Sequence, residues 1–259
     1  MRKARPQRVP AARKEAGKLL RIAGLPAVSA LFATSPERVE RLFFDDRMKP
    51  LTGAFCMTLA RARKPYRIVP PAELERVAGT VLHGGIVAVA QPRPLPELDL
   101  AAAQRWAEDG QPLLLLDGIG NPHNLGAVAR TAAFFGLPRI VLSDHPEQAG
   151  PSDASYRVAE GGLEHVALDR APRFAAALKG LRRSYRVVGT ALGKGQPLDA
   201  LRRTDKPVAL VLGNEEDGLP RATLDACDVV VTIPGTGSVQ SLNVSASAAI
   251  LIHALRHLG

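Results

Sequence analysis

Side chains that could do chemistry gather in three glycine-bearing loops in the second half of the chain. These loops are residues 117–132 (DGIGNPHNLGAVARTA), 213–220 (GNEEDGLP) and 233–249 (IPGTGSVQSLNVSASAA). Each loop directly follows a predicted strand, and open parallel sheets bind ligands outside the carboxyl ends of their strands. Glycine in such a loop lets the backbone approach a ligand closely. One loop of this kind is typical of an ordinary strand-to-helix turn, but three together predict a shared cleft.

The polar side chains of these loops define the candidate site. Asp117 ends a predicted strand, and Asn124 is expected to cap the helix that carries Arg130, six residues later. That separation is just under two helical turns, so Asn124 and Arg130 are expected to line one side of the cleft. In the third loop, Ser241 or Asn243 is expected to cap the final helix.

Several familiar chemistries are excluded by spacing. The segment Gly189–Gly195 (GTALGKG) is one residue short of the phosphate-binding pattern GxxxxGK[ST], and no Ser or Thr follows Lys194. Gly118 and Gly120 are followed by Gly126 rather than by the third glycine of a dinucleotide fingerprint. The sequence has no GxSxG or HExxH motif, and its six histidines are scattered. We therefore expect no nucleotide hydrolysis, no dinucleotide cofactor and no metal.

The elements that must position the loops follow a βαβ pattern. Short runs of Val, Ile and Leu alternate with helix-period segments, which predicts a parallel sheet covered on both faces. The predicted strands are 113–117, 139–142, 165–168, 185–190, 208–212 and 229–233. The predicted helices are 125–135, 171–181, 219–226 and 242–257. Because the last of these helices is apolar nearly all round, it is expected to be buried in the fold or in a subunit interface.

The first part of the chain divides into a basic tail, a small domain and a linker. Residues 1–21 carry eight Lys or Arg and one Glu, which is +7 of the total net charge of +9. Lys and Arg gain affinity by displacing counterions from phosphates, so the tail predicts a polyanion partner, although a solvated tail that aids solubility has the same composition. Residues 22–92 predict a small α/β domain with strands at 39–44, 66–69 and 85–90 and helices at 26–32, 51–63 and 71–77. Residues 93–111 predict a linker that contains one amphipathic helix, 98–109.

Composition indicates an intracellular globular protein. Hydrophobic residues make up 46% of the chain and charged residues 23%, which is ordinary for a soluble protein. The two cysteines cannot supply a disulfide framework, which favours a reducing compartment. No apolar run reaches the roughly 18 to 20 residues of a membrane span, and no apolar signal core follows the basic amino terminus. We expect a cytoplasmic protein without a membrane partner.

The three loops resemble, in order and spacing, the signature motifs of the SpoU, or TrmH-like, branch of the SPOUT methyltransferases. Asn124 and Arg130 match an Asn-x5-Arg motif, residues 213–215 match Gly-Asn-Glu, and residues 241–243 match Ser-Leu-Asn. For residues 112–259, the resemblance implies an α/β catalytic domain with a parallel sheet and a carboxyl-terminal trefoil knot. It also implies a homodimer. Residues 22–92 resemble, more weakly, the small α/β substrate-binding domain of many members, which is L30e-like.

The resemblance implies a methyltransferase that uses S-adenosyl-L-methionine and acts on a ribose 2′-hydroxyl of rRNA or tRNA. The cofactor-binding residues that it implies are Leu212, Gly213, Asn214, Ile233, Leu242 and Asn243. The catalytic residues that it implies are Arg130, together with Asn124 of the partner subunit, Glu215, Ser241 and Asn243. Arginine has a pKa of about 12.5 to 13.8 and almost never loses its proton. We therefore predict that Arg130 is essential because it holds a phosphate or stabilises the emerging alkoxide, rather than as the literal base.

Two other hypotheses remain open from the sequence. The chain could be an RNA-binding or ribosome-assembly factor that keeps the fold but has lost turnover, because Glu216 and Asp217 stand where many family members have Gly after the second-motif Glu. It could also be a methyltransferase that confers antibiotic resistance, which would use the same residues on another nucleotide. The sequence leaves the RNA and the nucleotide open.

Overall fold

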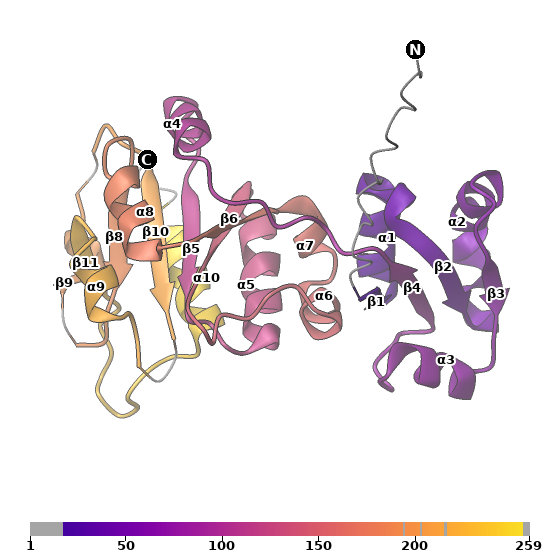
Figure 1. The fold of residues 1–259 in the computed structure, drawn as a ribbon. Coiled ribbons are helices and arrows are strands. Elements are labelled where there is room, and N and C mark those ends of the chain that lie inside the picture. The colour runs from indigo at the N-terminus through magenta and orange to yellow at the C-terminus, as the bar shows by residue number, and fades with distance from the viewer. Residues whose placement is uncertain (1–17, 194, 203, 215–216, 256–259) are drawn as a thin grey trace, which may run out of the picture.

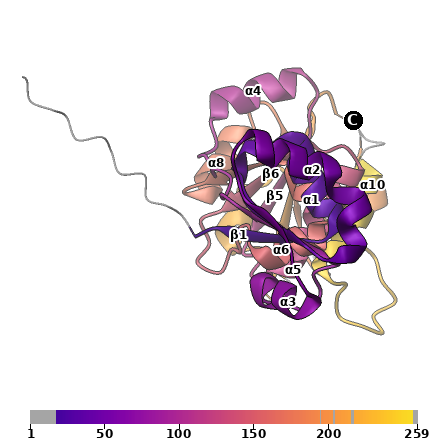
Figure 2. The same cartoon turned by 90° about the vertical axis from the view of Figure 1, so that its right-hand side faces the viewer.

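The structure is a computed structural model that describes residues 18–193, 195–202, 204–214 and 217–255 of the 259-residue chain. Figure 1 shows two lobes: a small amino-terminal lobe in indigo and a larger lobe that runs from magenta to yellow. Within the described residues each lobe is built on its own sheet, of four and seven strands. Figures 1 and 2 both place helix α4 at the top of the molecule and helix α3 at the bottom.

The small lobe is a mixed sheet with helices on both faces. Its strand order is β1-β4-β2-β3; β4 is antiparallel to β1 and β2, whereas β3 is parallel to β2. Because side chains alternate along a strand, Leu42 and Phe44 belong to the core beneath α1 and α2, while Phe43 between them packs towards α3. The elements are β1 (Leu20–Ala23), α1 (Leu25–Thr34), the 3₁₀ helix η1 (Pro36–Arg38), β2 (Val39–Phe44), η2 (Asp46–Met48), α2 (Lys49–Arg61), β3 (Tyr66–Ile68), α3 (Pro71–Ala78) and β4 (Ile86–Ala90).

The large lobe is a parallel sheet in the strand order β7-β6-β5-β10-β8-β11-β9 over the residues described. The elements are α4 (Leu100–Glu108), β5 (Leu113–Asp117), α5 (Pro122–Phe134), β6 (Arg139–Ser143), α6 (Asp153–Ala159), α7 (Gly162–His165), β7 (Ala167–Ala171), α8 (Phe174–Leu181), β8 (Arg186–Thr190), β9 (Gln196–Pro197), η3 (Leu198–Ala200), β10 (Val208–Gly213), α9 (Arg221–Leu224), β11 (Val229–Thr232) and α10 (Val244–Leu255).

The run of four leucines in β5 shows why the strands of this sheet are apolar throughout. Leu113 and Leu115 lie in the core shared with α4 and α8, whereas Leu114 and Leu116 lie in the core shared with α5 and α10. A parallel sheet covered on both faces needs apolar side chains on both faces of each strand. The predicted βαβ class is therefore confirmed.

Several predicted boundaries are wrong. Helix α5 begins at Pro122, and its cap is Asn121, whose side chain accepts a hydrogen bond from the His123 amide at 2.9 Å; Asn124 lies inside the helix and does not cap it. The strand expected at 165–168 is β7, which starts at Ala167. It extends beyond the apolar run because the buried Asp169 is paired with Arg139 at 2.8 Å.

Some short elements were not predicted at all. The first strand, β1, includes Leu20 and Arg21, which the sequence analysis assigned to the tail of residues 1–21. Its four residues carry one charge and follow a basic segment, so no alternation is visible, yet Leu20 pairs with Ala90 in the sheet. Helices α6 and α7 and the two-residue strand β9 were also missed because each is too short to show a period.

The two lobes are joined by buried polar contacts and by the linker. Arg38 of the small lobe pairs with Glu164 of the large lobe at 2.8 Å, and their side chains are only 10% and 1% exposed. The linker is hydrogen-bonded along β7, where the Leu98 amide donates to the Arg170 carbonyl at 2.8 Å. No helix in the described ranges is long and apolar enough to cross a membrane.

Candidate active site

A cavity of about 750 Å³ opens at the carboxyl ends of β8, β10 and β11. It is lined by the last residues of these strands and those that follow them, by residues of the loop 233–242 and by the first turns of α10. Small-molecule sites usually occupy about 300 to 1,000 Å³ and lie at this edge of a parallel sheet. The cavity therefore has the size and the place of a cofactor site.

The cavity brings together most of the residues that the sequence analysis assigned to cofactor binding. The residues of that set which line it are Leu212, Gly213, Asn214, Ile233 and Leu242, and the predicted catalytic residue Ser241 lines it too. The second and third loops therefore converge on one space, although they are separated by strand β11 in the chain. Their roles towards a ligand stay predictions.

The second loop is held in a tight hairpin-like turn. The backbone amide of Asn214 donates to the Gly218 carbonyl at 3.1 Å, and the Gly218 amide donates to the Asn214 carbonyl, also at 3.1 Å. A Cβ at Gly213 would lie 2.5 Å from the carbonyl carbon of Gly218, so only glycine fits there. The Asn214 side chain donates to the Gly118 carbonyl at 2.9 Å and so ties the second loop to the first. Glu215 and Glu216 lie outside the described residues, so the predicted role of Glu215 stays a prediction.

The amino end of α10 connects the third loop to the first. Asn243 caps this helix, as one of the two expected candidates, because its Oδ1 accepts from the Ser245 amide at 2.9 Å. Its Nδ2 donates to Oδ1 of Asn124 at 3.2 Å. Asn124 and Asn243 are therefore neighbours within one chain, whereas the resemblance implied that Asn124 acts across a subunit boundary.

Arg130 lies apart from the cavity of its own chain. It is not among the lining residues, its side chain is 57% exposed, and its Nη2 is 3.0 Å from Oε2 of Glu160 at the end of α6. Its helix position gives the reason: six residues advance the chain by about 600°, which turns Arg130 well away from the face that carries Asn124. The structure therefore brings together the predicted residues around Asn243 but not Arg130.

The walls of the cavity suit a ligand with an apolar ring. Four large hydrophobic side chains that solvent reaches in this structure line it, namely Leu192, Val239, Leu242 and Ile250, with 40% to 73% of each exposed. Beside them, a Cβ added at Gly193, Gly235 or Gly237 would meet no atom within 4 Å, so ligand atoms can approach the backbone there. The adenine ring and amino-acid part of S-adenosylmethionine match this mixture of apolar side chains and open backbone.

Part of this wall was not predicted from the sequence. Residues 191–193 follow strand β8 and line the cavity, but they were considered only as part of an incomplete phosphate loop. The signal that could have identified them is their position, because a glycine-bearing turn directly after a buried strand is the feature used for the other loops. Val239 and Ile250 carry no such signal, because an apolar side chain looks the same in a core and at a ligand.

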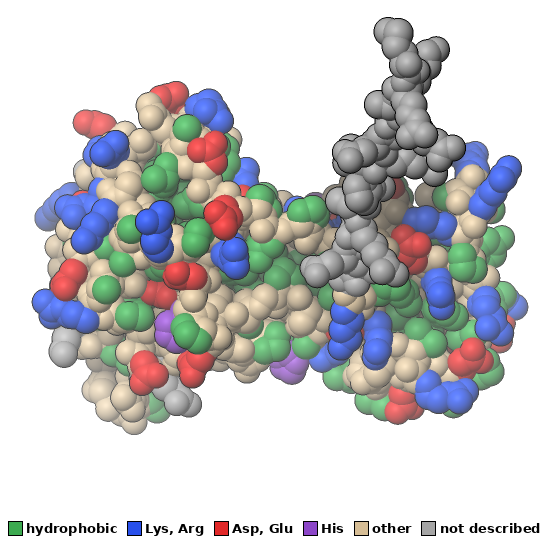
Figure 3. Space-filling model, viewed as in Figure 1, with side chains coloured by type: hydrophobic (Ala, Val, Ile, Leu, Met, Phe, Trp, Pro, Cys, Tyr) green, Lys and Arg blue, Asp and Glu red, His purple; other side chains and the backbone are tan. Residues whose placement is uncertain are grey.

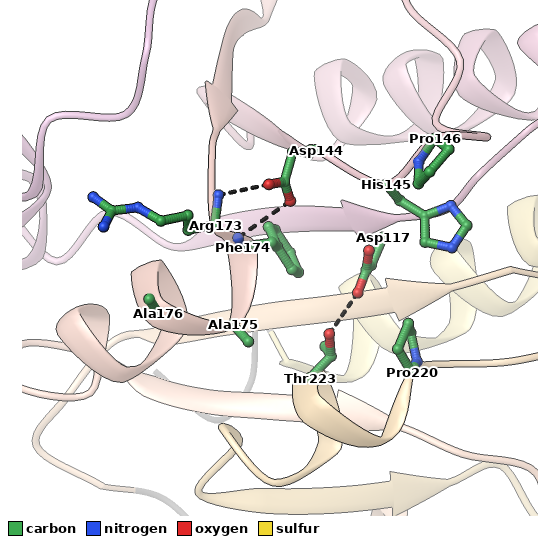
Figure 4. Close-up of a pocket in the computed structure, with 10 residues that line it drawn as sticks. All are labelled: Asp117, Asp144, His145, Pro146, Arg173, Phe174, Ala175, Ala176, Pro220 and Thr223. Carbon is green, nitrogen blue, oxygen red and sulfur yellow. Dashed lines mark hydrogen bonds between the residues drawn. The ribbon is translucent and has the colours of Figure 1, made fainter.

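A second cavity, of about 400 Å³, lies at the ends of β5 and β6 on the side of α8 and α9 (Figure 4). Its polar groups already have structural partners. Asp117 accepts from the Thr223 hydroxyl at 2.6 Å, and Asp144 accepts from the Arg173 amide at 2.6 Å. Burial opposes ionisation of Asp144, but hydrogen bonds from the backbone amides of Arg173 and Phe174 hold its pKa below the usual value. Because its carboxylates are negatively charged and already accept hydrogen bonds from the protein, this cavity does not suit an anionic ligand.

The described residues gather no group of three or more His, Cys, Asp and Glu side chains that could hold a metal ion. The two cysteines are partly buried and far apart in the chain. Burial, with the neighbouring Asp228, raises the pKa of the Cys227 thiol to about 12. Neither feature suggests nucleophilic thiol chemistry at the cavity.

Comparison with known proteins shows similarity over both lobes. Residues 111–253 match the model of the SpoU rRNA methylase family, and residues 21–96 match the model described as RNA 2′-O ribose methyltransferase substrate binding. The 23S rRNA (guanosine-2′-O-)-methyltransferase RlmB of Nitrosomonas europaea is 33% identical over 234 residues, which are 89% of this chain and 88% of that protein. The uncharacterized tRNA/rRNA methyltransferase YfiF of Escherichia coli O157:H7 is 35% identical over 241 residues, 93% of this chain and 68% of that protein.

A solved structure with a similar fold holds a cofactor. The AdoMet-bound rRNA methyltransferase from Sinorhizobium meliloti superposes with a TM-score of 0.76 at 21% identity, and the match covers 93% of this chain and 87% of that one. At this identity the likeness establishes the fold, and it does so for the two lobes together.

Proposed function

The chain belongs to the SpoU rRNA methylase family, and from this we propose that it transfers a methyl group from S-adenosylmethionine to a ribose 2′-hydroxyl of ribosomal RNA. The observation that carries the proposal is the cavity at β8, β10 and β11, where the second and third loops meet. A guanosine of 23S rRNA is the favoured target, because the RlmB relative spans most of this chain and is named for that reaction.

The cavity residues bind and orient the cofactor in this proposal. When bound, S-adenosylmethionine supplies a methyl group made electrophilic by the positively charged sulfur. The exposed faces of Leu242 and Ile250 cover its apolar part, and the open backbone at Gly235 accepts close contact. Expelling water from this space strengthens the polar interactions inside it.

Arg130 and the two asparagines act on the RNA ribose. The 2′-hydroxyl would give its proton to solvent. Its oxygen, negatively charged as the proton leaves, would then form a bond to the methyl carbon while the carbon–sulfur bond breaks and S-adenosylhomocysteine departs. The Arg130 guanidinium keeps its own proton and stabilises that charge or holds the adjacent phosphate. The Asn243–Asn124 hydrogen bond fixes the amide of Asn243, which stands in the chain between the cavity-lining residues Leu242 and Val244 and from there can orient the sugar.

We extend the proposal to a homodimer in which Arg130 serves the cavity of the partner subunit. Arg130 does not reach the cavity of its own chain, so a second copy would complete the site. Beside it on α5, Phe134 is 81% exposed and does not line the cavity. A large apolar side chain so exposed is typical of an association surface.

The small domain supplies a basic surface for the RNA. In the sheet register, Arg21 and Arg41 flank Val89 on the face that packs against α3, and Arg67 lies beside Phe43 on the same face. Arg41 and Arg67 are exposed and make no ion pair with any other described residue. Figure 3 shows Lys and Arg side chains spread over this lobe, and unpaired arginines complement RNA phosphates.

Finer features of the family belong to the same proposal. They are a trefoil knot formed by the carboxyl-terminal loops, an L30e-like small domain and a cytoplasmic location. The position of β10 between β5 and β8 and the packing of α10 on α5 and β10 support the knotted arrangement.

Methyl transfer from labelled S-adenosylmethionine to rRNA made without modifications tests the function. We expect label on one ribose 2′-oxygen. Binding of cofactor and RNA without any transfer would instead support the assembly-factor alternative.

A further inference from the structure

The five residues 160–164, which run from the C-cap of α6 into the first three residues of α7, contact both the small domain and the helix that carries Arg130. Oε2 of Glu160 forms an ion pair with Nη2 of Arg130 at 3.0 Å. At the other end of the segment, both carboxylate oxygens of Glu164 accept hydrogen bonds from Nη1 of Arg38 in the small domain, each at 2.8 Å. One short segment thus joins a predicted catalytic side chain to the RNA-binding lobe.

Two glycines in the middle of this segment lie where the lobes pack so closely that no side chain would fit. A Cβ at Gly161 would lie 2.9 Å from the Ala30 Cβ of helix α1 in the small domain. A Cβ at Gly162 would lie 2.7 Å from the Cα of Arg130 itself. Both distances are shorter than real Cβ contacts, so the backbone of the segment is wedged directly between α1 and α5.

Glu160 adopts a backbone conformation that its residue type disfavours. It ends α6 with φ 45° and ψ 44°, in the left-handed region where helices usually end on glycine. The only other non-glycine residues of the described chain with positive φ are Arg63 and Arg173. In this conformation the carboxylate of Glu160 lies beside the Arg130 guanidinium, so the disfavoured backbone and the ion pair occur at the same residue.

The contact with the small domain is fixed rather than loose. The Arg38 and Glu164 side chains are 10% and 1% exposed, and Arg38 also donates to the Tyr156 hydroxyl at 3.4 Å. Buried ion pairs with good geometry hold a unique arrangement, because separating the charges would leave one of them unpaired in the interior.

We propose that Glu160 is a positioning residue for Arg130, and that the segment 160–164 conveys the placement of the small domain to that guanidinium. Glu160 holds Arg130 in one orientation before the RNA arrives. The same segment also fixes the position of the small domain through Glu164. RNA bound to that domain is therefore held in a defined position relative to the Arg130 guanidinium. The proposal rests on the proposed methyl transfer.

Replacing Glu160 with glycine tests the first half, because fold and function should then move in opposite directions. Glu160→Gly relieves the left-handed strain, so its unfolding midpoint should equal or exceed that of the wild type. Its kcat should fall about tenfold or more, because a misplaced catalytic group costs up to about a hundredfold. The KM for S-adenosylmethionine should stay within twofold, and Glu160→Gln, which keeps a hydrogen-bond acceptor, should recover part of kcat.

Arg173→Gly is the matched control, because it relieves the same strain at φ 55° in a residue outside the proposed site. It should leave kcat unchanged. A Glu160→Gly enzyme with wild-type kcat would overturn the positioning role. Absence of methyl transfer by the wild-type protein would instead contradict the proposed function, so the two failures are distinguishable.

A double-mutant cycle tests the second half. Glu164→Gln weakens the ion pair that holds the small domain against the large lobe. It should lower kcat in the wild-type background, when measured at a temperature where the variant is folded. In the Glu160→Gly background it should have little further effect, because the link to Arg130 is already cut. Losses that multiply independently would show that the segment does not couple the two lobes.

Discussion

Asn243 serves both the fold and the proposed chemistry with one side chain. Its oxygen caps α10 and its nitrogen donates to Asn124. The two tasks use different atoms, so substitutions can separate them.

Asn243→Asp should retain the cap but lose the site. An aspartate oxygen still accepts from the Ser245 amide, so the free energy of unfolding should stay within about 0.5 kcal/mol of the wild type. The aspartate carboxylate cannot donate a hydrogen bond as Nδ2 of Asn243 does, so methyl transfer should fall at least about tenfold. Asn243→Ala should lose about 1 kcal/mol as well, because the cap is gone. Urea unfolding beside the transfer assay measures both; full activity in Asn243→Asp would rule out the role at the ribose.

Cys227 predicts how stability responds to alkaline pH. Burial, with Asp228 nearby, raises the pKa of its thiol from 9.0 to about 12 in the folded chain. Below pH 9 the thiol is neutral in both states. Above it the unfolded chain releases a proton that the folded chain keeps, so stability should fall by at most about 1.4 kcal/mol per pH unit between pH 9 and 12.

Cys227→Ser provides the comparison for this pH dependence, because a hydroxyl does not titrate in the range. Tyr185, whose pKa burial raises to about 12, remains in both proteins. Urea unfolding at pH 8, 9 and 10 should therefore show a steeper decline for the wild type. Parallel declines would contradict the assignment to the thiol.

Single residues also show the limits of the sequence. The motif residues around the cavity could be predicted, because residue type and spacing after a strand are local properties. The pairing of Arg130 with Glu160 could not, since it depends on a short helix end that has no period. The choice of Asn124 as helix cap failed because Asn121, with Pro122 behind it, competes for the same task.

At the scale of elements, long periodic segments were predictable and short ones were not. The six-residue strand β10 and the helix α10 have many apolar side chains in register, and both were found. The four-residue helix α7 packs on α5 and α1 only through tertiary contacts, which a sequence read locally does not contain.

The sheet face of the small domain that carries Arg41 and Arg67 should bind RNA phosphates. Replacing both with alanine should weaken RNA binding and reduce the slope of log affinity against log salt by about 0.7 to 0.9 for each lost contact. Cofactor affinity should be unchanged. Arg105→Ala is the matched control, because it removes an exposed arginine from α4, which both views place on the opposite side from α3. Equal RNA affinity in the double variant would exclude this face.

At the scale of the whole molecule, two lobes with separate sheets meet at one interface, which contains a buried ion pair and two closely packed glycines. The sequence indicated two domains and a linker. It could not show that they are packed together, because Arg38 and Glu164 are 126 residues apart and look like surface charges.

The basic tail, called the arm below, should strengthen RNA binding without affecting cofactor binding. Because β1 starts at Leu20, deletion of residues 2–17 removes most of the arm's charge and spares the sheet. RNA affinity should fall and its salt dependence flatten, while S-adenosylmethionine affinity stays the same. An arm of equal length with Gln at each Lys and Arg should behave like the deletion. Unchanged RNA affinity would remove the arm from the account.

The central claim is that this chain methylates an RNA ribose with the help of Arg130. The most direct test is transfer of tritium from labelled S-adenosylmethionine to rRNA that lacks the modification, run with wild type and Arg130→Ala, followed by nuclease mapping of the labelled nucleotide. The account predicts label on a single ribose 2′-oxygen with the wild type and its loss with Arg130→Ala, while the variant still binds cofactor. Label on a base, or full transfer by Arg130→Ala, would contradict it.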